Sequence, residues 1–552
     1  MKGFPTRRLF ITFGLAAVCV LCSGFVLTGD SDVYLKVDQG ITLFGKVYKE
    51  ITANYVDEVD PTKFMEAGID GMLGTLDPYT VYISREEGDE VDLMTNGKYG
   101  GIGVTIGVRD GAMRIISVMD GYSAQRQGLL PGDVLLEVDG VSVQNKKPDD
   151  VRNLTRGEPG TSVRVKIRRE GEAKPLEFTL TREEVQLRNV TYADYVAPGI
   201  GYIRLERFSR RAGEEVRQAI KELQVKGDLK GVVLDLRGNP GGLLDAAVEV
   251  ASKFLPKGSL VVSTRGRAPE SEKKYVSSEE PVLPTTPLAV LTDHGSASAS
   301  EIVAGSLQDL DRAVIVGTRT FGKGLVQTIL PLSYGAQLKV TTARYYTPSG
   351  RCIQEIDYQH RDKNGIFVIT PDSLRKEFKT ERGRPVFERG GIQPDSVVEE
   401  PDEGPMVREI GRKGLFFNFA NHYAATHPGT QFDTVTSETL KEFKDYLAAQ
   451  KFDFVEDSET RLKDLEKAAE QTHMSKDVLA ELDRVSGMIE KNKEHAFDRY
   501  RDHLTDELGQ ELAARYRGEK GRIAASLGDD PQLHAAIGLL THSKVLKEKL
   551  GG

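Results

Sequence analysis

The feature that most constrains the fold of this chain is the segment of residues 287–327. It opens with an apolar run, residues 288–291, which is typical of a buried strand. A polar turn follows at residues 293–295, and apolar residues then recur at helical spacing over residues 302–310. The segment therefore predicts a strand, a tight turn and a helix, which together form a unit of a layered α/β fold.

Three serines, Ser296, Ser298 and Ser300, lie where this helix should begin. The first turn of a helix carries unpaired backbone N–H groups and the positive end of the helix dipole, and both favour developing negative charge. Serine is also a good N-cap residue. The serines alone therefore leave a structural role and a catalytic role open.

Lys323 favours the catalytic role. It stands between Gly322 and Gly324, just before a strand-like run at residues 325–332. Flanking glycines allow backbone to pack closely around a side chain, and burial lowers the pKa of a lysine amine. Such a lysine can act as a general base near neutral pH, and a serine paired with a lysine is an established nucleophile arrangement.

The runs GSASASEIVAGSLQD and GTRTFGKGLVQ closely resemble the carboxyl-terminal processing proteases, also called tail-specific proteases. The resemblance implies that Ser298, three residues before Glu301, is the nucleophile. It implies that Lys323, 25 residues after the serine, is the general base and that Gln327 supports the lysine. The implied protein is a serine-type endopeptidase with a crotonase-like α/β core and no metal or cofactor.

The motif DLRGNPGG at residues 235–242 ends a buried, strand-like run and matches the turn that faces the nucleophile in this family. A tetrahedral intermediate needs preorganised N–H donors for its oxyanion. We expect these donors to come from Gly241 or Gly242 and from Ala299.

Two further polar residues lie near Ser298. Glu301 is expected mainly to cap the helix, and the alternative is that it holds the serine and the lysine in place. His294 is interpreted as a turn residue, because the family uses no histidine at this position.

Residues 97–182 resemble a PDZ domain, from GIGV to LLPGDVLLEVDG. The resemblance implies that the backbone at Gly101, Ile102, Gly103 and Val104 binds a peptide carboxylate while the peptide adds as a strand to the sheet edge.

Other parts of the chain complete the predicted organisation. Residues 1–30 form a signal peptide or membrane anchor, with basic residues ahead of an apolar run at residues 9–27. An extracytoplasmic, periplasmic location follows, with possible anchoring to the inner membrane. Residues 31–96 are an N-terminal helical region, which in the family caps the protease or joins subunits. Residues 183–400 form the protease core, with a charged insert at residues 355–388 that short family members lack.

The resemblance covers roughly residues 40–400 and does not extend firmly to residues 401–552. The pattern of residues 401–552 predicts charged helices with an apolar stripe. We expect this stripe to be covered by another chain. Assembly or docking of an adaptor protein is the expected role. A chain ending near residue 400 is accordingly expected to fold.

Composition limits the partners. The 552 residues carry a net charge of −9, which argues against a nucleic-acid partner. The expected partners are protein substrates with accessible C-terminal tails, an adaptor protein, a second copy in a homo-oligomer, and a membrane through the N-terminal segment.

Two alternative functions are a catalytically silent PDZ scaffold, which would lack Ser298, Lys323 or Gln327, and a crotonase-type enzyme acting on acyl-CoA thioesters. Export to a compartment without CoA argues against the second.

Overall fold

The computed structural model describes residues 30–85, 87, 88, 93, 95–361, 365, 367–369 and 371–552, with side chains from residue 33 onward. The predicted export segment, residues 9–27, lies outside the described residues. The chain divides into two compact units, the first ending at Tyr82 and the second beginning at Ile83. Within the described part of the chain, no helix is both long enough and apolar enough to cross a bilayer.

The first unit contains a helical pair, α2 (Asp30–Asn54) and α3 (Pro61–Leu73). Asp60 caps α3 by accepting hydrogen bonds from the amides of Thr62 and Lys63. The two helices meet where the rings of Tyr48 and Phe64 stack, with centroids 5.9 Å apart. Much of α2 stays exposed, including several large apolar side chains.

The segment predicted to be a PDZ domain forms an antiparallel sheet in the order β3-β4-β5-β7-β8, with β6 paired to β5. Its strands and helices are β2 (Lys98–Gly101), β3 (Val104–Arg109), β4 (Ala112–Val118), α5 (Ser123–Gln127), β5 (Val134–Val138), β6 (Val141–Ser142), α6 (Pro148–Thr155), β7 (Ser162–Arg168), β8 (Leu176–Thr181) and β9 (Glu183–Gln186). The apolar residues of β4, β5, β7 and β8 alternate inward and build one core. Because β3 is the edge strand, one side of it is open to a further strand.

The predicted α/β core is a six-stranded sheet in the order β10-β11-β12-β15-β16-β23. Only the β10–β11 pair is antiparallel; the other neighbours run parallel. The strands are β10 (Val190–Ala197), β11 (Ile200–Leu205), β12 (Gly231–Asp235), β15 (Leu288–Thr292), β16 (Val314–Gly317) and β23 (Ser396–Val397). Strand β12 lies next to β15, so the segments that leave their carboxyl ends meet at one edge of the sheet.

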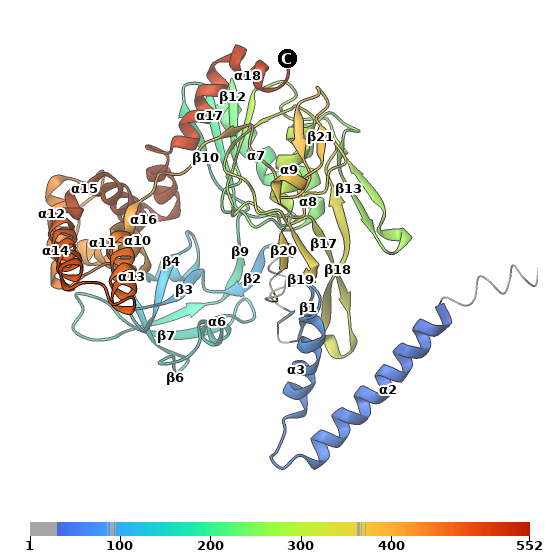
Figure 1. The fold of residues 1–552 in the computed structure, drawn as a ribbon, viewed down its shortest axis with the longest axis horizontal. Helices are drawn as coiled ribbons and strands as arrows, with labels where there is room; N and C mark the ends of the chain where they lie inside the picture. The colour runs from blue at the N-terminus through green and yellow to red at the C-terminus, as the bar shows by residue number, and fades with distance from the viewer. Residues whose placement is uncertain are drawn as a thin grey trace, which may run out of the picture. The chain divides into compact units, whose positions relative to one another are not determined.

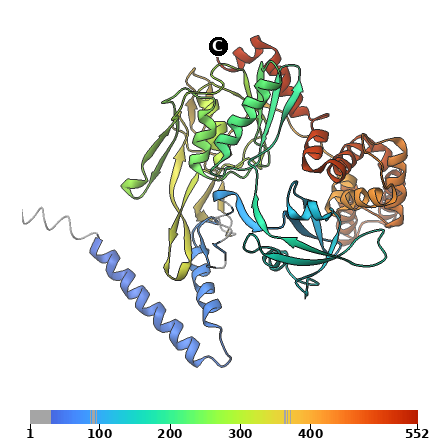
Figure 2. The same cartoon turned by 180° about the vertical axis from the view of Figure 1, so that it is seen from behind.

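Helices cover both faces of this sheet (Figures 1 and 2). On one face lie α7 (Ala212–Lys226), α8 (Leu244–Ser252) and α9 (Ala299–Asp309), which share the main apolar core with the sheet. On the other face, α17 (Pro531–Thr541) and α18 (Ser543–Lys549) pack against side chains of β11, β12, β15 and β16. Helices of residues 531–549 therefore complete the α/β core.

A second sheet of the core orders its strands β17-β18-β13-β14, all antiparallel. The strands are β13 (Leu260–Gly266), β14 (Lys273–Val276), β17 (Leu325–Pro331) and β18 (Gln337–Tyr346). The charged insert folds into two short hairpins, β19 (Ile356–Arg361) with β20 (Phe367–Ile369), and β21 (Glu377–Lys379) with β22 (Pro385–Phe387).

The C-terminal region has an apolar core of its own. Its helices are α10 (Gly404–Arg412), α11 (Leu415–Thr426), α12 (Ser437–Ala449), α13 (Asp457–Gln471), α14 (Lys476–Lys493), α15 (Ala496–Arg499) and α16 (Arg501–Ser526), followed by α17 and α18. At the centre of this core, where α11, α12 and α16 meet, the ring of Phe443 stacks on that of Phe416 and lies tilted against that of Phe419.

These contacts bear on two expectations for the C-terminal region: that another chain covers its apolar surface, and that a chain ending near residue 400 folds. Much of its apolar surface is covered by its own helices and by the six-stranded sheet. A chain ending near residue 400 would uncover one apolar face of that sheet, so its folding stays a prediction that a truncated chain must test. Leu465 on α13 and Val478 on α14 remain 51% and 39% exposed.

Candidate active site

Ser298 lies between β15 and α9, at the point where the chain turns from strand to helix. Its backbone angles are φ 57° and ψ −111°. A residue with a Cβ atom pays about 1–3 kcal/mol for such a conformation, which persists only where the surroundings impose it. Strain of this kind concentrates at functional sites, and here it holds a half-buried serine at the start of a wholly buried helix.

Asn239 ties the DLRGNPGG turn to the segment that carries Ser298. Its carbonyl oxygen accepts from the Ala297 amide at 3.0 Å and from the Ser300 hydroxyl at 2.9 Å. Its side chain donates to the carbonyl of Leu205 at 2.6 Å and accepts from the amide of Gly241 at 2.9 Å. This fully buried asparagine therefore fixes the distance between the glycine turn and the serine.

The glycine turn packs directly against Ser298. A Cβ atom on Gly241 would lie 2.6 Å from the carbonyl oxygen of Ala297 and 2.9 Å from the Ser298 Cβ, so only glycine fits. The Gly241 amide is engaged by Asn239. In contrast, the amides of Gly242 and Ala299 donate to no other described residue.

Glu301 joins the serine to the lysine segment. Its carboxylate is completely buried and accepts four hydrogen bonds. Oε2 accepts from the amides of Ser298 at 2.8 Å and Lys323 at 2.9 Å. Oε1 accepts from the Gly322 amide at 2.7 Å and from the Thr320 hydroxyl at 2.6 Å. The side chain thus caps α9 and also positions the main chain of both predicted catalytic residues.

Burial raises the pKa of Glu301 to about 7, although the four hydrogen bonds oppose this shift. The Thr320 hydroxyl is the one partner that could reverse its role, because it can donate to a carboxylate or accept from a carboxylic acid. The three backbone amides can donate to either form. The link between Ser298 and Lys323 therefore tolerates a proton on Glu301.

Lys323 is half-buried in the loop that leads into β17. Both flanking glycines permit a close approach of residues 354–355: a Cβ atom on Gly322 would lie 2.8 Å from the Glu355 Cβ, and one on Gly324 would lie 2.8 Å from the Gln354 nitrogen. The Gly324 carbonyl accepts from the Tyr345 amide at 2.9 Å. The loop is therefore held on several sides.

Gln327 lies on β17, and its side-chain amide donates to the hydroxyl of Thr341 on the neighbouring strand β18 at 3.1 Å. A break in the strand register falls between Val326 and Gln327. Such irregularities redirect side chains and are common beside active sites.

Tyr345 is a site residue that the sequence did not single out. It lies on β18, is 1% exposed, and its hydroxyl donates to the carbonyl oxygen of Ser298 at 3.2 Å. Burial, and to a smaller extent the charge of Glu301, raises the pKa of Tyr345 well above its usual value. The phenol therefore stays protonated and remains a donor to the strained residue. Only the folding of the second sheet over α9 brings it there.

Arg237 connects the glycine turn to the C-terminal helices. Its guanidinium donates to Asp235 at 2.7 Å, to Asp530 at 2.6 Å and to Gln532 at 3.1 Å. Burial opposes ionisation of Asp235, but Arg237 outweighs it and holds the pKa of this carboxyl below its usual value. Asp530, directly before α17, and Gln532, in its first turn, thus hold Arg237 in place next to the glycine turn.

His294 is exposed, and its ring lies 5.6 Å from that of Phe321. In the described part of the chain it makes no hydrogen bond or ion pair. This position fits a turn residue.

The predicted carboxylate loop of the PDZ segment lies between β2 and β3. The carbonyls of Ile102 and Gly103 accept from Ala124 and Met119, while their amides donate to no other described residue. Gly103 has φ +80°, and a Cβ atom there would meet Tyr122 at 2.4 Å. The loop therefore presents two unpaired N–H groups beside the edge strand β3.

Four regions of the chain match known families. These are "Activating protease CtpB N-terminal domain" over residues 28–87, "PDZ domain" over 114–169, "Peptidase family S41" over 199–362 and "Probable PDZ-protease, C-terminal helical domain" over 406–540. The matches define a serine peptidase of family S41 that contains a PDZ domain. The last match corrects the expectation that the resemblance does not extend firmly beyond residue 400.

Individual relatives define the family more closely. A carboxy-terminal-processing protease of Bartonella bacilliformis is 38% identical over 344 residues, covering 62% of this chain and 78% of the relative. The carboxy-terminal processing protease CtpB of Bacillus subtilis is 31% identical, covering 73% and 85%. A carboxyl-terminal-processing protease of Synechocystis is 36% identical, covering 72% and 89%. The chain belongs to the carboxy-terminal processing protease family.

The predicted family, the α/β core with its PDZ domain and flanking helical regions, and the peptidase activity are therefore confirmed. Neither the silent scaffold nor the acyl-CoA enzyme is supported.

Proposed function

We propose that this chain is an exported endopeptidase that holds protein substrates by their C-terminal tails and cleaves near the tail with Ser298 and Lys323. The observation that carries the proposal is the strained backbone of Ser298, which Glu301 ties directly to the backbone of Lys323. A buried carboxylate bonded to both segments keeps their separation constant, and a nucleophile and its base require such constancy.

In the proposed reaction, the Ser298 hydroxyl attacks the scissile carbonyl carbon and the neutral Lys323 amine takes the hydroxyl proton. The negative charge on the carbonyl oxygen is stabilised by the amides of Gly242 and Ala299, which have no other acceptor. When the peptide bond breaks, the Lys323 ammonium gives its proton to the leaving amine. Water then hydrolyses the acyl-enzyme, with the lysine again as base. Gln327 positions the lysine, and Tyr345 holds the carbonyl of Ser298.

Recognition of the tail is assigned to the PDZ domain. The unpaired amides of Ile102 and Gly103 bind the terminal carboxylate, while the neighbouring Gly101 and Val104 shape the loop. The tail adds as a strand to the open edge of β3. A carboxylate held by backbone N–H groups forms charge-assisted hydrogen bonds, which favour a free C-terminus over an amide.

An extracytoplasmic location is supported by the basic residues and apolar run at the start of the sequence. Whether this segment is cleaved or retained as an inner-membrane anchor is decided by N-terminal sequencing of the protein isolated from cells. Self-association is supported by the large apolar side chains that α2 exposes, such as Tyr34 and Ile41 at 73% and 67%. An adaptor protein that delivers substrates remains a further prediction.

Cleavage of a tail-bearing protein, followed by mass spectrometry, tests the assignment. Ser298→Ala and Lys323→Ala should each abolish cleavage, and Lys323→His should not restore it, because the shorter imidazole side chain cannot bring its nitrogen to the position of the lysine amine. His294→Ala is the matched control and should cleave at the native rate. If Lys323→Ala cleaves at the native rate and His294→Ala does not cleave, the general base is His294 and the assignment of Lys323 is wrong.

A further inference from the structure

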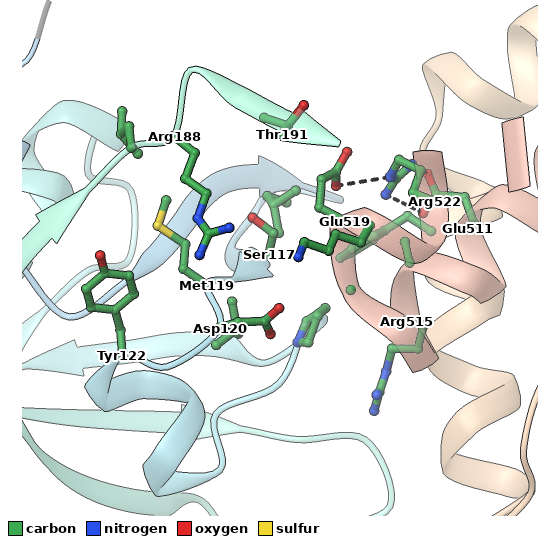
Figure 3. A pocket seen from close by; sticks show the side chains of 18 of the residues that line it. Ser117, Met119, Asp120, Tyr122, Arg188, Thr191, Glu511, Arg515, Glu519 and Arg522 are labelled. Atoms are coloured by element: carbon green, nitrogen blue, oxygen red, sulfur yellow. Dashed lines mark hydrogen bonds and ion pairs between the residues drawn. The ribbon is translucent and has the colours of Figure 1, made fainter. Parts of the chain in front are cut away.

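A cavity of about 400 Å³ lies between the PDZ domain, the segment that follows it and the C-terminal helices (Figure 3). The PDZ domain contributes residues 116–122, and α16 contributes residues from Glu511 to Arg522. The volume falls within the range of ligand-binding pockets. The cavity is distinct from the carboxylate loop at residues 101–104 and from Ser298.

Four basic side chains line this cavity without a direct ion pair. Arg188, Arg207, Arg515 and Lys520 form no hydrogen bond or ion pair with any described residue. The other basic side chain of the lining, Arg522, is already neutralised by Glu511 at 2.7 Å and Glu519 at 3.4 Å.

The carboxylates present do not balance these charges. Beyond those paired with Arg522, the lining holds only Asp120, which accepts from the side chain of Gln125 at 2.7 Å. Arg188, Arg207 and Lys520 therefore share one carboxylate of the lining, in a chain whose net charge is −9, while Arg515 also lies within the field of Asp133. Burial lowers the pKa of Arg515, although the charge of Asp133 opposes this shift.

Buried donors point to the same conclusion. The Nε atoms of Arg207 and Arg515 and the hydroxyl of Thr191 are buried and have no hydrogen-bond partner among the described residues. The Oδ1 atom of Asn421, also in the lining, is a buried acceptor without a partner, so the polar groups around this cavity do not satisfy one another. Figure 3 shows Arg188 and Asp120 on the PDZ side, facing α16 across the cavity.

Apolar side chains also belong to the lining of this cavity. Met119, Tyr122 and Phe417 belong to the lining and would be left uncovered by a compact inorganic anion. A short peptide with alternating acidic and apolar side chains would satisfy both kinds of surface. We propose that this cavity binds an acidic peptide segment of a protein partner, outside the PDZ groove and the active site.

Fluorescence anisotropy tests the proposal with the full chain carrying Ser298→Ala, which prevents cleavage. The probe is a labelled hexapeptide in which three glutamates alternate with leucine and tyrosine, amidated so that the PDZ loop cannot read a free carboxylate. It should bind at least tenfold more tightly at low salt than the same peptide with glutamine in place of glutamate. The double substitution Arg207→Gln, Lys520→Gln should weaken binding at least tenfold.

Matched controls keep the result specific. Arg168→Gln removes an exposed arginine of the PDZ domain outside the cavity and should leave affinity unchanged. Lys520→Glu, at an exposed position of the lining, should bind a lysine-containing version of the peptide more tightly than the native cavity does, with an unchanged melting temperature. Equal binding of the glutamate and glutamine peptides, or an equal loss in Arg168→Gln, overturns the proposal. Full displacement by millimolar inorganic phosphate identifies a compact-anion site instead and also overturns it. None of these outcomes bears on cleavage by Ser298, which the assay of Ser298→Ala and Lys323→Ala tests separately.

Discussion

Replacing Glu301 with glutamine should change stability differently at acidic and alkaline pH. The glutamine oxygen can accept from Ser298 and Lys323 in place of Oε2. Its NH2 group then occupies the position of Oε1, where it can donate to the Thr320 hydroxyl but faces the N–H group of Gly322. One buried donor is left without an acceptor, which costs about 1–3 kcal/mol.

The pKa of Glu301 adds a dependence on pH. Burial raises it from 4.5 to about 7 in the folded protein. The folded state therefore binds the proton more tightly, so the stability contributed by this group is fully present below pH 4.5 and is lost as the pH rises through 7. From pH 5 to pH 8 the native chain loses about 2.5 kcal/mol through this group. Glutamine does not titrate, so the variant avoids that loss.

Urea unfolding followed by circular dichroism measures the difference, with both chains on the Ser298→Ala background to prevent self-cleavage. At pH 5 the unpaired donor should make the variant about 1–3 kcal/mol less stable than the parent chain. At pH 8 the parent has lost about 2.5 kcal/mol through Glu301, so the variant should lie between about 0.5 kcal/mol less stable and about 1.5 kcal/mol more stable. Glu222→Gln, at an exposed position of α7, should differ from the parent chain equally at both pH values. A difference for Glu301→Gln that stays constant, or that grows in favour of the native carboxylate at pH 8, would refute the assigned burial and bonding.

Three further changes test other contacts, each measured as steady-state cleavage of a tail-bearing peptide or as dye binding. Asp530→Asn should lower kcat with little change in KM, because Arg237 loses one of its two carboxylates directly before the glycine turn, and an unchanged kcat would rule out this coupling. Tyr345→Phe removes a hydrogen bond to Ser298 worth about 0.5–1.5 kcal/mol, so kcat should fall up to about tenfold; a change confined to KM would contradict this role. A chain ending at residue 400 should bind a hydrophobic dye and lose cleavage activity, because α17 no longer covers the catalytic sheet, whereas a folded, active truncated chain would show that the cover is dispensable.

Local patterns were sufficient to predict the strand–turn–helix unit around Ser298. Apolar runs and helical spacing report directly which side chains must be buried, so β12, β15 and α9 could be read from the chain. Close backbone contact was also foreseeable from the glycines beside Lys323, because only a residue without a Cβ atom fits such an approach. The sequence equally predicted the α/β core and the PDZ domain through long motif resemblances.

Contacts between segments distant in the sequence were not predictable in this way. Glu301 was expected mainly as a helix cap, because its bond to Ser298 is local. Its bonds to Gly322 and Lys323 exist only after the loop before β17 folds over α9. Tyr345 reaches Ser298 from a different sheet, and no periodicity records that approach.

The sequence by itself determined the chemical groups and the elements that carry them: a serine at a helix start, a lysine between glycines, and helices in the last third of the chain. Tertiary structure alone decided that Asp530 pairs with Arg237, that α17 covers the catalytic sheet, and that the PDZ domain and α16 enclose an unneutralised cavity. The physical reason is range. Burial patterns act within one element, whereas ion pairs, cavities and the coverage of a sheet depend on which elements meet, and chain closure over more than a hundred residues leaves no local signal of that choice.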